Sequence, residues 1–149
     1  PGAEHWPAFK KNLSDQFEAR LVQVQIRNSN SKLLANMDAW SIPVASAHGE
    51  GRAVFDDASD MENLKANNQI ALQFIHSQDQ PTETYPLNPN GSPEGITGIT
   101  SKDGRVTIMM PHPERVFRSI QMSWQDKAWK DYSPWMQMFI NAKDFSDNS

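Results

Sequence analysis

The most informative stretch of this chain is residues 106–114, Val106-Thr-Ile-Met-Met-Pro-His-Pro-Glu114. Its first five residues form an apolar run that is typical of a buried strand, and the other four residues follow directly from the end of that strand. In α/β folds, functional side chains collect where strands end and loops begin. The two prolines restrict the backbone around His112. This stretch therefore predicts a buried strand of an α/β fold that carries a candidate site at its end.

The other strands around this stretch are short and are separated by clusters of Pro, Gly and Asn. An irregular alternation near Leu21 and Val22 predicts a bulge or a bend in the first of them. Asp103-Gly104 predicts the turn of a hairpin that ends in the 106–110 strand. The remaining strands are expected over residues 17–26, 42–47, 52–55, 70–75 and 96–100.

Two segments have the features of helices. Residues 57–67 begin with acidic side chains, which favour a helix N-terminus. Residues 134–145 follow Ser133, a good N-cap, and have proline at the first helical position. The apolar stripe of this second helix is expected to consist of Trp135, Met138, Phe139 and Ala142.

The composition excludes several classes of protein. The chain has 149 residues, a net charge of -4 and no cysteine, so disulfides and cysteine-bound zinc are excluded. An acidic chain lacks the basic face of a general nucleic-acid binder, and we expect no nucleic-acid partner. The sequence has no apolar run near the roughly 20 residues that span a bilayer, so we expect no membrane partner. A cytoplasmic location is the expectation.

His112 and Glu114 are candidate catalytic residues. A carboxylate two residues after a histidine is able to hold its tautomer and stabilise the imidazolium, as a general base requires. The same spacing also fits an ordinary loop histidine paired with a glutamate. A metal site built from His48, His112 and a carboxylate is a third alternative, although the zinc-deaminase pattern fails without cysteine.

His48-Gly49-Glu50-Gly51-Arg52 is a second candidate site. Two glycines beside polar side chains suit backbone contacts to a small polar ligand. An ordinary turn explains the same residues, and the two interpretations remain open at this point.

Taken together, the motifs resemble class I glutamine amidotransferase domains. Residues 106–118 resemble the closing motif of these domains, and more closely that of the glutaminase domain of the large phosphoribosylformylglycinamidine synthases. Four further stretches agree in order: Asn12-x-Ser-Asp-x-Phe-Glu-Ala-Arg20, Ala47-His-Gly-Glu-Gly-Arg52, Glu83-Thr-Tyr-Pro-x-Asn-Pro-Asn-Gly-Ser-Pro-x-Gly-Ile96 and Ser133-Pro-Trp-Met136. The resemblance covers nearly the whole chain.

This resemblance implies a cysteine-dependent glutaminase with L-glutamine as its substrate. His112 takes the role of the base, Glu114 orients it, and Ser46, Ala47, His48 and Gly49 line the glutamine pocket. The ammonia would amidate formylglycinamide ribonucleotide at a separate synthetase domain that uses ATP and magnesium. No cofactor or metal is expected in this chain itself.

The resemblance also implies the fold, the part of the domain that this chain represents and the part that it lacks. We expect an α/β fold with a mixed sheet, the C-terminal half of a flavodoxin-like amidotransferase domain, over residues 1–149. The nucleophile half would lie upstream of Pro1, where the chain was cut. The partners would then be that missing half and the synthetase domain, and the isolated chain would be inactive. The alternative is a non-catalytic partner or binding module that keeps the amidotransferase shape.

Overall fold

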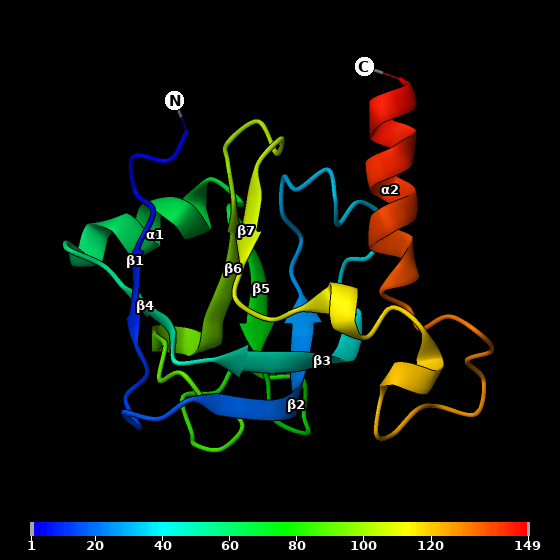
Figure 1. Ribbon diagram of the computed structural model, residues 1–149. Coiled ribbons are helices and arrows are strands. Elements are labelled where there is room, and N and C mark those ends of the chain that lie inside the picture. The colour runs from blue at the N-terminus through cyan, green and yellow to red at the C-terminus, as the bar shows by residue number, and fades with distance from the viewer. Residues whose placement is uncertain (1, 149) are drawn as a thin grey trace.

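A computed structural model describes residues 2–148 of the chain (Figure 1). Pro1, where we expect the chain to have been cut, lies outside this range. The strands are β1 (Ala8–Lys11), β2 (Glu18–Ile26), β3 (Ser41–His48), β4 (Glu50–Val54), β5 (Ile70–Phe74), β6 (Ile96–Thr100) and β7 (Thr107–Met109). The helices are α1 (Ala58–Ala66) and α2 (Met136–Asp147), with short 3₁₀ turns η1 (Pro93–Gly95), η2 (Pro113–Arg115) and η3 (Ser119–Gln121).

One curled sheet forms the centre of the fold, with the strand order β3-β2-β5-β6-β7, while β1 and β4 pair separately. Figure 1 shows β2 curving from its pairing with β3 to run beside β5. The β2–β3 pairing has no register shift between Glu18↔His48 and Gln25↔Ser41. The irregularity expected near Leu21 and Val22 is therefore a bend and not a bulge.

The strand directions differ from the expected mixed sheet. Every strand pairing within residues 2–148 is antiparallel. Parallel neighbours need a long crossover connection, usually a helix. The one α-helix that connects two strands in this range is α1, and it joins β4 to β5, which lie in different sheets. The α/β class itself is confirmed.

The apolar core has two parts. The larger part joins β2, β3 and β5 to Trp135, just before α2. The smaller part packs Leu64 of α1 against Ala53, Ile70, Ile96 and Ile99. Figure 1 shows α1 and α2 at opposite sides of the molecule, with strands between them. All residues of β5 and β6 are buried, whereas β7, which the sequence predicts as a buried strand, is at the edge of the sheet and is only partly buried.

The predicted hairpin and helices are present with small shifts. Gly104 has a φ of 74°, and the Ser101 N–H donates to Val106 O at 2.8 Å, which closes the β6–β7 hairpin. The helix predicted over residues 57–67 is present as α1, and Asp57 is its N-cap, with a side chain that accepts from the Ser59 N–H. The second helix begins two residues later than predicted, because Ser133 and Pro134 form a turn before it. Its expected stripe is only partly buried, since Phe139 is 37% exposed.

Candidate active site

The end of β7 brings His112 back against β3. The His112 N–H donates to Ala45 O at 2.8 Å, which forms an isolated antiparallel bridge to that strand. The next residues form the single turn η2, so the Glu114 side chain folds back toward the histidine. The distance between His112 Nδ1 and Glu114 Oε1 is 2.9 Å. The structure therefore brings together the two residues that the sequence predicts as a pair.

This geometry fixes which ring nitrogen is the base. A carboxylate accepts hydrogen bonds, so Glu114 favours the tautomer in which Nδ1 carries the proton and Nε2 is free to accept one. The His112 side chain is 28% exposed, which leaves it accessible to a reacting group. The arrangement is that of a histidine base with an orienting acid.

The predicted pocket segment lies directly beside this pair. The rings of His48 and His112 have centroids 6.1 Å apart at an angle of 48°. Ser46 and His48 are buried, and Ser46 Oγ lies 3.4 Å from His48 Nε2. Burial lowers the pKa of His48, and the nearby His112 lowers it further. His48 is therefore neutral near pH 7 and does not add charge beside the base.

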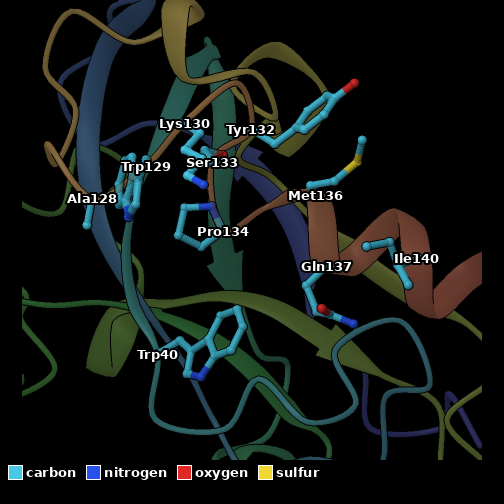
Figure 2. A pocket seen from close by; sticks show the side chains of 10 residues that line it. All are labelled: Trp40, Ala128, Trp129, Lys130, Tyr132, Ser133, Pro134, Met136, Gln137 and Ile140. Carbon is cyan, nitrogen blue, oxygen red and sulfur yellow. The ribbon is translucent and has the colours of Figure 1, made fainter.

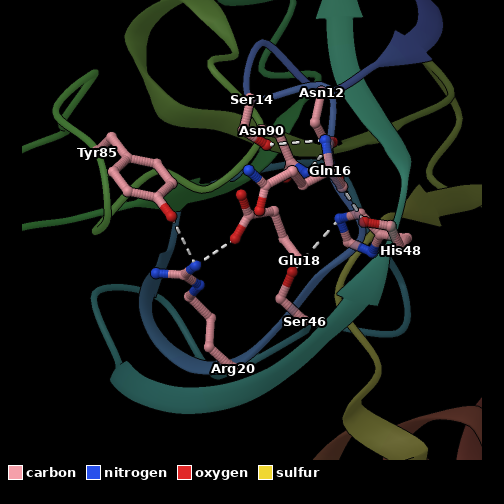
Figure 3. A network of polar contacts seen from close by, with 9 residues as sticks. All are labelled: Asn12, Ser14, Gln16, Glu18, Arg20, Ser46, His48, Tyr85 and Asn90. Atoms are coloured by element: carbon pink, nitrogen blue, oxygen red, sulfur yellow. Dashed lines mark hydrogen bonds and ion pairs between the residues drawn. The ribbon is translucent and has the colours of Figure 1, made fainter.

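A partly buried polar network on the adjacent strand was not predicted from the sequence (Figure 3). Glu18 lies opposite His48 and Arg20 lies opposite Ser46 in the β2–β3 register. The Glu18 side chain is 3% exposed and forms an ion pair with Arg20, whose Nη2 also donates to the Tyr85 hydroxyl at 3.0 Å. These charged residues share the strand face of Val22 and Val24, both buried. Charged residues at alternating positions on a strand face with buried valines could have indicated this network from the sequence.

Metal ligation was the third alternative for this site. Within residues 2–148, no three His, Asp or Glu side chains are grouped so that they could hold a metal ion. His48 and His112 therefore lack a third ligand among these residues.

A hollow of about 420 Å³ lies between Trp40 and the start of α2 (Figure 2). Its lining is largely aromatic and aliphatic and includes Trp129, Tyr132 and Ile140. None of the six predicted site residues lines it.

Among the residues described, no helix has the length and apolar character needed to cross a membrane.

Comparison with known proteins identifies the family of the chain. A family model described as the CobB/CobQ-like glutamine amidotransferase domain matches residues 1–146. The chain belongs to this family. The structure of PurLQS from Thermotoga maritima matches the amidotransferase fold described above with a TM-score of 0.65 and 22% sequence identity. The match covers 94% of this chain and 53% of that chain, so this domain spans about half the length of the matched structure. The likeness confirms the expected fold.

If Glu114 orients a histidine base for glutamine hydrolysis, Glu114→Gln is expected to lower kcat for that reaction by about 10- to 100-fold in the full-length protein. The amide still accepts the Nδ1–H but no longer stabilises an imidazolium. The expected loss is smaller than for a buried acid because Glu114 is 56% exposed. Glutamate release at saturating glutamine measures the effect.

The matched control for this substitution is Glu62→Gln on the exposed side of α1. Glu62 is 67% exposed and pairs with Lys65, so its loss is expected to leave kcat within twofold. A Glu114→Ala variant with the kcat of the wild type would remove Glu114 from the mechanism.

Proposed function

We propose that this chain supplies the base and its orienting acid for the hydrolysis of glutamine. The observation that carries the proposal is the 2.9 Å contact between His112 and Glu114 at the end of β7. This contact lies beside β3, in a chain that belongs to a glutamine amidotransferase family. Ser46, Ala47, His48 and Gly49 line the glutamine pocket in this proposal.

The nucleophile in this proposal is a cysteine outside the 149 residues, because the chain contains none. A free thiol is mostly protonated at pH 7, and an adjacent imidazole takes its proton. The thiolate then attacks the side-chain amide carbon of glutamine, and the amide nitrogen takes a proton and leaves as ammonia. Water hydrolyses the resulting glutamyl thioester to glutamate and restores the thiol.

The ammonia is used, in the same proposal, to amidate formylglycinamide ribonucleotide in cytoplasmic purine biosynthesis. The five stretches that resemble phosphoribosylformylglycinamidine synthase support this acceptor, and the fold likeness to PurLQS is consistent with it. Residues 1–149 then form the C-terminal portion of the glutaminase domain. ATP and magnesium act at a synthetase domain that is likewise outside these residues.

A comparison of the isolated chain with the full-length protein tests this function. The isolated 149 residues are expected to release no glutamate from glutamine above background, whereas the full-length protein hydrolyses it. Robust hydrolysis by the isolated chain would contradict a cysteine-dependent mechanism. A full-length protein that is also inactive would favour the alternative of a non-catalytic partner with the amidotransferase shape.

A further inference from the structure

Asn12 holds the backbone of the segment that we propose binds glutamine. Its Nδ2 donates to His48 O at 2.9 Å, and its backbone N–H donates to Gly49 O at 2.9 Å. Asn12 is 2% exposed and lies in the loop between β1 and β2, so these contacts join two segments that are distant in sequence. One buried residue thus fixes two successive carbonyl groups at the end of β3.

The fixed carbonyls also determine where the neighbouring N–H groups point. A peptide group is planar and trans, so its N–H is directed opposite to its carbonyl oxygen. The contacts of His48 O and Gly49 O with Asn12 therefore orient the N–H groups of Gly49 and Glu50. A side chain added at Gly49 would meet no atom within 4 Å, so the space beside this glycine is open. A ligand placed there would meet a backbone whose orientation is already set.

Asn90 in turn holds the Asn12 side chain (Figure 3). Asn90 is fully buried, and its Nδ2 donates to Asn12 Oδ1 at 2.7 Å. This bond allows only the orientation of the Asn12 amide in which Nδ2 faces His48 O. Asn90 also packs close to the His48 ring, because a Cβ added at Gly51 would lie 2.5 Å from His48 Nε2 and 2.7 Å from Asn90 Nδ2.

We propose that Asn12 and Asn90 are positioning residues for glutamine binding, with Asn90 acting through Asn12 on the His48–Gly49 backbone. The inference rests on the proposed function and assigns a role to two stretches, residues 12–20 and 88–95, that had none. Neither side chain is required to touch glutamine. Their effect is on how the pocket backbone is held before the substrate arrives, which lowers the cost of binding.

The test is steady-state glutamine hydrolysis by variants of the full-length protein. Asn90→Ala is expected to raise the KM for glutamine about three- to tenfold, and Asn12→Asp about tenfold or more, with kcat within about threefold in both. Asn12→Asp keeps the size and the acceptor for Asn90 but loses the donor to His48 O. Alkylation of the catalytic thiol by iodoacetamide, which does not use the glutamine pocket, should keep its rate.

The double variant Asn12→Ala/Asn90→Ala tests whether Asn90 acts through Asn12, which we call a relay, or whether the two residues affect the KM independently. Because Asn90 acts through Asn12, the double variant should have the KM of Asn12→Ala alone. Independent effects would multiply, and that result would overturn the relay. If Asn12→Ala does not fold, the pair Asn12→Asp and Asn12→Asp/Asn90→Ala gives the same comparison.

Asn141 provides a matched control on α2. It is also a buried asparagine whose Nδ2 donates to two backbone carbonyls, Leu33 O at 3.0 Å and Ala35 O at 2.7 Å. Asn141→Ala is expected to lower stability without changing the KM. A wild-type KM in the Asn12 and Asn90 variants, or an equal rise in Asn141→Ala, would overturn the inference. A wild-type protein without glutaminase activity would instead overturn the proposed function, and this inference with it.

Discussion

His112→Ala in the full-length protein is expected to reduce glutamine hydrolysis by about 10³-fold or more, because it removes the imidazole that we propose as the base for the thiol. The alanine side chain has no group that could accept the proton. His48 does not replace it, since its ring is buried and its Nε2 faces Ser46 Oγ. The loss should appear in kcat, because the role we propose for His112 is toward the thiol and the thioester and not toward the binding of glutamine.

The measurement is glutamate release under single-turnover and steady-state conditions. The control is His76→Ala in the turn after β5, where the histidine Nδ1 accepts from the Gln78 N–H at 3.1 Å. This second variant should keep wild-type kcat and KM, because it changes only a surface turn. Near-normal turnover in His112→Ala would exclude His112 as the base.

Much of the fold was predictable because it depends on local patterns. The β6–β7 hairpin follows from Asp103-Gly104 between two apolar runs, and α1 follows from Asp57 at its start. The strand directions were not predictable in the same way. Which strands become neighbours depends on long-range packing, and the position of β2 between β3 and β5 has no local signal.

In the candidate site, too, the local contact could be predicted from the sequence and the long-range contact could not. His112 and Glu114 are two residues apart, so one 3₁₀ turn brings them into contact and the sequence spacing was sufficient. Asn90 and Asn12 are 78 residues apart, and only the folded chain joins them. The family resemblance identified both stretches but gave no reason for either asparagine. The buried charge of Glu18, beside them, was visible in the alternation of β2 and was not used.

The largest effect on stability is expected at Trp135. Its side chain is fully buried in the larger core, and its Nε1 donates to Pro43 O at 2.8 Å. Trp135→Ala leaves a cavity and an unpaired carbonyl, so the free energy of unfolding should fall by about 4 kcal/mol or more. A typical domain has only about 5–15 kcal/mol in total, so much of the population could unfold. Urea unfolding of the 149-residue chain, followed by circular dichroism, measures this change.

Two further variants separate the causes of that loss. Trp135→Phe keeps an aromatic ring but loses the donor to Pro43 O, and should cost about 1–3 kcal/mol. Trp124→Ala removes a side chain that is 58% exposed and packs edge to face on Trp129, so it should cost about 1 kcal/mol or less. Equal losses in Trp135→Ala and Trp124→Ala would contradict the assignment of Trp135 to the core. Because Pro43 lies on β3, a Trp135 variant that unfolds early should also release the strand that carries Ser46 and His48. The stability of the segment before α2 is thereby linked to the proposed glutamine pocket.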